Sequence, residues 1–187
     1  MQSTNRQIII ILNGVGSSGK SSTARALQEI AAVPLIYVAM DDFLEMLPEK
    51  FWGHTDGLVF KPSQLDGSPA ISIEVGIICR RLLSGMRHAV AAMARQGNSL
   101  IVDEVMLGDE AEEYRELLKG FDVRFIRLSA PLDVLEERER LRGDREIGLA
   151  RGQYDMIQLG KGYDLEIDAG TNTPMQNAQQ IRDFLGL

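Results

Sequence analysis

The sequence is poor in cysteine and in net positive charge, and each shortage excludes a class of protein. Its single cysteine, Cys79, cannot form an internal disulfide, which fits a reducing compartment. The 27 acidic residues outnumber the 20 basic ones, so the formal net charge is −7 at pH 7. A surface this negative repels phosphate backbones and anionic lipid headgroups, so we expect neither nucleic acid nor a membrane surface as a partner.

Long apolar runs are also missing. The longest aliphatic run, Ile8–Leu12, is far shorter than the about 20 residues of a membrane span or the at least about 7 of a secretory signal core. Nothing therefore indicates export or membrane insertion, and we expect a cytoplasmic protein. The length of 187 residues, with 44% hydrophobic and 25% charged residues, suits one globular domain with a sizeable core.

Apolar runs and amphipathic stretches alternate along the chain, which is the pattern of an α/β domain with a mostly parallel sheet. Five runs are typical of buried strands: Gln7–Asn13, Leu35–Met40, Ser99–Val105, Val123–Ser129 and Asp164–Asp168. Six stretches predict helices: Lys20–Ala31, Asp42–Lys50, Ile73–Arg95, Asp109–Lys119, Pro131–Arg142 and Pro174–Leu185.

Two segments interrupt this alternation. Residues Phe51–Pro69 contain several glycines and prolines and predict an irregular excursion, and a loop of that length is usually functional or mobile. Residues Arg142–Gly162 are densely charged and punctuated by glycines, and they precede the last strand, where a mobile lid would fit. We therefore expect a single domain, 1–187, with a substrate-side excursion at 51–69 and a lid at 142–162.

The strongest motif is the segment Gly14-Val15-Gly16-Ser17-Ser18-Gly19-Lys20-Ser21, which matches the phosphate-loop pattern G-x-x-x-x-G-K-[ST] in full. Its glycines let successive backbone N–H groups point at one phosphate, and the following helix adds its positive N-terminal end. Lys20 supplies a charge for the β- and γ-phosphates, and the Ser21 hydroxyl is a ligand for Mg²⁺. We expect residues 14–22, Ser22 included, to bind a nucleotide; the alternative is a turn that only caps a helix.

A carboxylate ends the aliphatic run Ser99–Val105. At the tip of a strand beside a phosphate loop, Asp103 is placed to hold a water of Mg²⁺. In the alternative, Asp103 only marks the point where the chain leaves the core for a loop. Glu104 should point to the opposite face, because side chains alternate along a strand.

Two further carboxylates, Asp41 and Asp42, follow the second predicted strand. Asp42 and Glu45 have the spacing of a capping box, which gives Asp42 a structural role. Asp41 then lies at the carboxyl end of the sheet, where ligands bind in open α/β folds. Phosphoryl transfer to an alcohol needs a group that orients the hydroxyl and accepts its proton, and Asp41 is the candidate base. In the alternative, Asp41 is the cap and Asp42 is exposed.

Four arginines fall within eight residues, at positions 138, 140, 142 and 145. Guanidinium groups supplied by a closing segment stabilise the charge of a transferring phosphoryl group. Arg142 and Arg145, which flank Gly143, are the candidates for this role. The alternative is a solvated helix face, since glutamates are interleaved.

The remaining conspicuous side chains have structural explanations. The spacing of His54 and His88 suggests no metal site, and Cys79 lies on a helix without the pattern of a thiol enzyme, so core packing is expected there. Trp52 and Phe60 lie in the excursion, where they would either form the wall of a pocket or anchor the segment.

Taken together, these residues resemble the chloramphenicol phosphotransferase family, small antibiotic kinases of the P-loop type. The likeness runs through most of the chain: Ile11–Ser21, Asp41 with Glu45 and Pro48, Ala91–Arg95 with Gly97, Ile101–Gly108, Arg142–Arg145 and Tyr163–Asp168. The chain departs from the family's pattern in Phe51–Pro69, which should help form the acceptor pocket, and at Gln158, where many members have histidine.

The resemblance implies a three-layer α/β/α P-loop fold of the nucleotide-kinase kind. It implies ATP with Mg²⁺, and transfer of the γ-phosphoryl group to a hydroxyl of a small molecule such as chloramphenicol, an antibiotic-resistance activity. Asp41 matches the family's proposed base. Two other hypotheses stay open: a kinase of another metabolite, and an ATP-binding module without transfer. The acceptor and the oligomeric state, a homo-oligomer included, are left open, and Ala169–Thr173 is the candidate wall for adenine.

Overall fold

The protein is described by a computed structural model that covers residues 7–143, 146–158 and 162–187. Its centre is a five-stranded sheet of β1 (Ile9–Asn13), β2 (Leu35–Ala39), β5 (Ser99–Glu104), β6 (Val123–Ser129) and β7 (Leu165–Asp168). The strand order is β2-β5-β1-β6-β7, and each neighbouring pair is parallel. The predicted five-stranded α/β fold is thus confirmed, and the sheet is parallel throughout.

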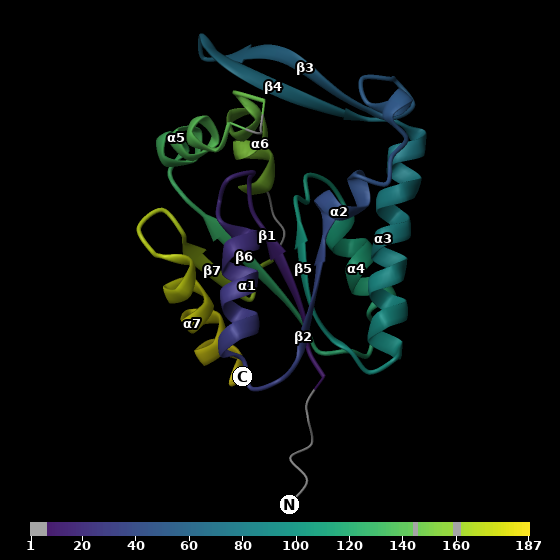
Figure 1. The fold of residues 1–187 in the computed structure, drawn as a ribbon, viewed down its shortest axis with the longest axis vertical. Coiled ribbons are helices and arrows are strands. Elements are labelled where there is room, and N and C mark those ends of the chain that lie inside the picture. The colour runs from purple at the N-terminus through teal and green to yellow at the C-terminus, as the bar shows by residue number, and fades with distance from the viewer. Residues whose placement is uncertain (1–6, 144–145, 159–161) are drawn as a thin grey trace, which may run out of the picture.

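Helices cover both faces of this sheet (Figure 1), with α1 (Lys20–Ile30) and α7 (Pro174–Leu185) on one face and α3 (Ile77–Arg95) and α4 (Glu110–Leu117) on the other. Side chains of β1 point alternately to the two faces of the sheet, so they contribute to two separate hydrophobic cores. Ile8, Ile10 and Leu12 pack toward α1 and α7, while Ile9 and Ile11 pack toward α3 and α4. Burial on both sides explains why this strand is a continuous aliphatic run.

The segment predicted to be an irregular excursion is instead an antiparallel hairpin over most of its length. Strands β3 (Leu58–Leu65) and β4 (Ser68–Val75) pair with each other and with no strand of the central sheet. Asp66 and Gly67 form the turn with φ of 51° and 75°, the left-handed conformation that short hairpin turns favour. Pro62 was expected to break structure, but a two-stranded ribbon has only edge strands, where proline is tolerated. Figure 1 shows the hairpin above the carboxyl ends of the central strands.

Two predicted helices have different bounds. The α3 helix begins at Ile77 rather than Ile73, because the residues up to Val75 pair with β3. The helix predicted over Asp42–Lys50 is divided into α2 (Met40–Leu44) and a 3₁₀ turn (Glu49–Phe51). The predicted capping box is wrong: the N-cap of α2 is Ala39, and no side chain caps it.

The segment predicted to be a lid contains helix α6 (Leu149–Gln158), which follows α5 (Leu132–Arg142). Together α5 and α6 lie beside the hairpin at the same end of the molecule (Figure 1). No helix in the part of the chain that the structure describes is long and apolar enough to cross a membrane.

Candidate active site

The phosphate loop connects β1 to α1 and has the backbone form that its sequence predicts. Gly19 and Ser17 take left-handed conformations, with φ of 89° and 65°, and α1 begins directly after Gly19. Gly14 allows close contact with β6, because a Cβ there would lie 2.5 Å from the carbonyl oxygen of Leu128. The hydroxyls of Ser17 and Ser18 are buried and form no hydrogen bond with any described residue. Buried, unpaired donors in a loop of this form fit phosphate oxygens.

Lys20 is held inside the loop. Its side chain is 7% exposed, and Nζ donates to the carbonyl oxygens of Gly14 at 2.9 Å and Val15 at 3.3 Å. The same Nζ lies 3.6 Å from Oδ1 of Asp103. Hydrogen bonds to the loop carbonyls therefore fix the position of the ammonium group beside the Asp103 carboxylate.

The predicted magnesium ligands are in direct contact. The Ser21 hydroxyl donates to Oδ2 of Asp103 across 2.7 Å, so β5 and α1 bring together one hydroxyl and one carboxylate. Tyr37 on β2 also donates its hydroxyl to Oδ2, at 2.8 Å. Burial and the nearby Asp103 charge raise the pKa of Tyr37 well above its usual value, so its hydroxyl remains a neutral donor. Mg²⁺ usually takes one or two protein oxygens plus phosphates and water, and this donor set fits it.

Asp41 and Arg142 complete the cavity in front of the loop. That cavity is lined by loop residues together with Ala39, Met40, Asp41, Asp103, Val105 and Arg142. Asp41 lies in the first turn of α2, and Arg142 is the last residue of α5. The structure thus brings Asp41, Asp103 and Arg142 to the phosphate loop, whereas Arg145 lies outside the described residues.

A second cavity extends from the loop toward α7. It is lined on the far side by Arg138, Leu141, Ala169, Asn172, Pro174 and Asn177. Arg138 donates Nη2 to the carbonyl oxygen of Ala169 at 2.8 Å, which fixes its guanidinium against the β7–α7 connection. Ala169 and Asn172 belong to the segment predicted to contact adenine.

A third cavity lies between the hairpin, α2, α3 and α6. Its walls are mostly apolar: Met40, Leu44, Leu58, Phe60, Ile73, Val75, Leu83, Val105, Leu107 and Leu149. Its polar lining consists of Asp41, Glu104, Glu110, Gln153 and the backbone at Gly16. No lysine, arginine or histidine is among its described lining residues. Phe60 therefore forms part of a pocket wall, whereas Trp52 is exposed and does not.

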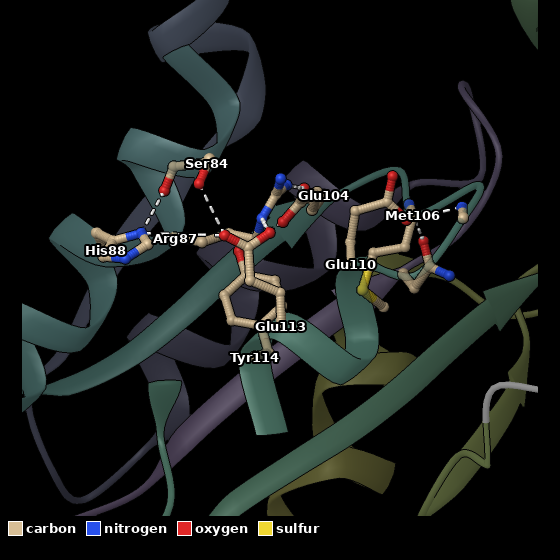
Figure 2. Close-up of polar contacts among 10 residues, drawn as sticks. Ser84, Arg87, His88, Glu104, Met106, Glu110, Glu113 and Tyr114 are labelled. Carbon is tan, nitrogen blue, oxygen red and sulfur yellow. Dashed lines mark hydrogen bonds and ion pairs between the residues drawn. The ribbon is translucent and has the colours of Figure 1, made fainter. Parts of the chain in front are cut away.

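Glu104 belongs to a buried polar network that supports this third cavity (Figure 2). Oε1 of Glu104 accepts from Nη1 of Arg87 at 2.6 Å, and Oε2 accepts from the Tyr114 hydroxyl at 2.5 Å. Arg87 also donates Nε to Glu113 at 2.6 Å. Burial raises the pKa of Glu104, and the Arg87 charge and the Tyr114 hydrogen bond oppose that increase. As predicted, Glu104 points away from the face that Asp103 occupies.

Three contributors were missed or given little weight in the sequence. Tyr37 stands out only as a hydroxyl in an otherwise apolar strand. Gln153 of α6, whose Oε1 accepts from the Gly16 N–H, belongs to no motif. Arg138 lies in the arginine cluster, but the candidates chosen there were Arg142 and Arg145. Cys79, which was expected to pack in the core, is buried. Both histidine side chains, for which no metal site was expected, are at least half exposed.

Within residues 7–143, 146–158 and 162–187, no group of three or more His, Cys, Asp or Glu side chains is arranged to hold a metal ion. Mg²⁺ bound by only one or two protein oxygens usually takes phosphate and water oxygens as well, so Ser21 and Asp103 would share such an ion with a nucleotide.

Comparison with known proteins agrees with this geometry. Residues 7–186 match the family described as "Chloramphenicol phosphotransferase-like protein". Proteins from two strains of Mycobacterium tuberculosis, each named as a candidate O-phosphotransferase, are 27% identical over 176 residues, covering 89% of this chain and 76% of theirs.

Solved structures show the same fold at low identity. The APS kinase CysC of Mycobacterium tuberculosis, in complex with AMPPNP and APS, has a TM-score of 0.66 at 18% identity, covering 97% of this chain and 99% of its own. Shikimate kinase from Acinetobacter baumannii has a TM-score of 0.59 at 15% identity, covering 96% and 94%. The fold is therefore that of the P-loop nucleotide kinases, and with a match over nearly its whole length the chain belongs to the chloramphenicol phosphotransferase-like family.

Proposed function

We propose that this chain is an ATP-dependent phosphotransferase that moves the γ-phosphoryl group to a hydroxyl of a small, uncharged, largely apolar molecule such as chloramphenicol. The observation that carries the proposal is the position of Asp41. This residue lines both the cavity in front of the phosphate loop and the apolar pocket beneath the hairpin. A carboxylate shared by the two cavities is placed to serve both reactants.

Each residue then has a defined role. The loop N–H groups, Lys20 and the buried serine hydroxyls hold the phosphates, and Arg142 with Arg145 stabilises the charge of the transferring group. Asp41 orients the acceptor hydroxyl and takes its proton. A bond forms between that oxygen and the γ-phosphorus while the bond from phosphorus to the β–γ bridging oxygen breaks, and ADP leaves.

Mg²⁺ would be held by Ser21 and Asp103, and when bound it neutralises phosphate charge during transfer. Lys20, Tyr37 and Ser21 all contact the Asp103 carboxylate. These contacts fix the orientation of the carboxylate, which favours one binding geometry. The nucleoside would lie in the second cavity, between Arg138 and Asn172.

The acceptor class follows from the lining of the third cavity. Apolar walls with an aromatic ring favour a molecule with a hydrophobic body. The lining has three carboxylates, of which Glu104 is paired with Arg87, and no described cation, so an anionic acceptor would find no partner for its charge among these residues. This argues against sugar acids and nucleotides and in favour of a neutral, drug-like alcohol. ATP is the phosphate donor, so we place the reaction in the cytoplasm.

A panel of acceptors tests the proposal. ADP release in a coupled assay should depend on chloramphenicol or another neutral aromatic alcohol, and shikimate or gluconate should give little. Mass spectrometry should find the acceptor heavier by one phosphoryl group. A chain that binds ATP yet forms no phosphorylated product from any hydroxyl compound would be an ATP-binding module instead. Expression in a sensitive bacterium should raise its chloramphenicol tolerance, whereas the Asp41→Asn variant should not.

A further inference from the structure

The phosphate cavity and the acceptor pocket meet at Gly16, where a side chain occupies part of the phosphate loop. Gly16 lines both cavities, and Gln153 of α6 lines the acceptor pocket. The Gly16 N–H donates to Oε1 of Gln153 across 3.0 Å, in a buried hydrogen bond. One backbone donor of the cradle is therefore paired with a protein oxygen, although such donors ordinarily serve phosphate.

The other half of the same carboxamide is available to the acceptor pocket. Gln153 is 5% exposed, and because Oε1 is turned toward Gly16, Nε2 is directed away from that N–H. Nε2 donates no hydrogen bond to any of the described residues. Gln153 lines a mostly apolar pocket, so Nε2 offers a ligand there a polar contact point.

Helix α6 connects Gln153 to the hairpin that covers the pocket. Gly152 lies directly against β4, since a Cβ there would be 1.8 Å from the Ile71 carbonyl oxygen. The Ile71 N–H donates to the Gly148 carbonyl oxygen at 2.9 Å, and the buried Glu139 carboxylate accepts from the Gly148 N–H at 2.8 Å. The backbone of α6 next to Gln153 is thus in direct contact with β4.

We propose that Gln153 is a positioning residue that couples the γ-phosphate to the acceptor pocket, an inference that rests on the proposed function. Without a γ-phosphate, Oε1 holds the Gly16 N–H. A γ-phosphate oxygen takes that N–H, and the released carboxamide pairs with a polar group of the alcohol in the pocket. By linkage, the acceptor binds better beside a triphosphate than beside a diphosphate. After transfer, re-formation of the Gln153–Gly16 bond favours release of product.

The test measures nucleotide affinity and needs no knowledge of the acceptor. Isothermal titration calorimetry on the full chain with Mg²⁺ compares AMPPNP with ADP. Gln153→Met keeps the length of the side chain but removes the competing oxygen, so AMPPNP should bind roughly two- to tenfold tighter, while ADP affinity should change by less than about twofold. Gln153→Glu keeps the oxygen and adds a negative charge, so AMPPNP should bind roughly tenfold or more weakly, with a smaller effect on ADP.

Asp155→Asn, an exposed position on the same helix, is the matched control and should leave both affinities unchanged. Circular dichroism checks that each variant is folded. If Gln153→Met does not fold, the nucleotide affinities of Gln153→Glu test the proposal. Equal shifts for the two nucleotides, or no shift in either, would overturn the role of Gln153 while the phosphotransferase proposal stands. A wild-type chain that binds neither nucleotide would overturn the proposed function and this coupling together.

Discussion

The ion pair between Arg87 and Glu104 allows a quantitative test of how the acceptor side is supported. The two side chains are 7% and 1% exposed, and their nearest charged atoms are 2.6 Å apart. In an Arg87→Met variant, the Glu104 carboxylate would stay in the core with the Tyr114 hydroxyl as its remaining partner. Removal of one partner of a buried pair costs about 3–5 kcal/mol, because the other charge is left uncompensated. The lost contact with the Glu113 carboxylate, which is 32% exposed, adds at most about 1 kcal/mol.

The loss should depend on pH. Burial already raises the pKa of Glu104 in the folded chain, and the Arg87 charge opposes that increase, so its removal raises the pKa further. A carboxyl whose pKa is higher folded than unfolded binds protons preferentially in the folded state. Stability therefore falls as pH rises from the unfolded value through the folded one. We expect the variant to be closest to wild type near pH 5 and farthest from it near pH 8.

Urea denaturation with an unchanged m-value measures the difference in free energy. The double variant Arg87→Met with Glu104→Gln removes both charges, so it should recover at least half of the loss and show little dependence on pH. A loss below about 1 kcal/mol in the single variant would refute the reasoning, because it would mean that Glu104 is hydrated or otherwise compensated. A loss of stability that is equal at pH 5 and pH 8 would also refute it.

Further predictions concern the site and the packing around it. Asp41→Asn should lower kcat by about 10²–10⁴-fold with nucleotide affinity almost unchanged, as measured by coupled ADP release and calorimetry; near-normal turnover would exclude Asp41 as the base. Gly152→Ala should cost about 1–3 kcal/mol in urea denaturation because the new methyl group meets the Ile71 carbonyl, whereas Gly85→Ala, with no atom within 4 Å, should stabilise α3 by about 0.5–1 kcal/mol. Equal effects of the two alanines would contradict the close contact. Burial raises the pKa of the Cys79 thiol, so maleimide should modify it far more slowly in the folded chain than in urea, and fast labelling of the folded chain would contradict its burial.

The central fold was predictable because its signals are local and agree with one another. One continuous segment contains the aliphatic run of β1, the phosphate-loop motif and the helical pattern that begins at Lys20. These three signals support one another, because a phosphate loop needs a strand before it and a helix after it. Asp41 and Asp103 could be predicted because the carboxyl ends of parallel strands meet at one edge of the sheet, whereas Arg142 was predicted from the density of arginines around it. The placement of the two carboxylates around the loop follows from topology rather than from any remote contact.

The acceptor side was harder to predict, since its structure depends on contacts between distant segments. Prolines and glycines in residues 51–69 are typical of loops, and only the pairing of β3 with β4 makes them strand residues. The Asp66-Gly67 pair is a hairpin signal that the surrounding breakers obscured. Gln153 reaches Gly16 across 137 positions of sequence, and no spacing rule connects a helical glutamine to a phosphate loop.

The hairpin forms its own two-stranded sheet and shares no backbone pairing with the central strands. Side chains of β3 and β4 line the apolar cavity, while the phosphate loop connects β1 to α1. Under the proposed function, substitutions on the pocket face of the ribbon should change which alcohol is accepted, whereas Ile71, whose backbone contacts α6, links the ribbon to Gln153 and the phosphate loop. Under the proposed function, the ribbon is thus the segment in which substrate preference can change during evolution with the fewest changes to the central sheet.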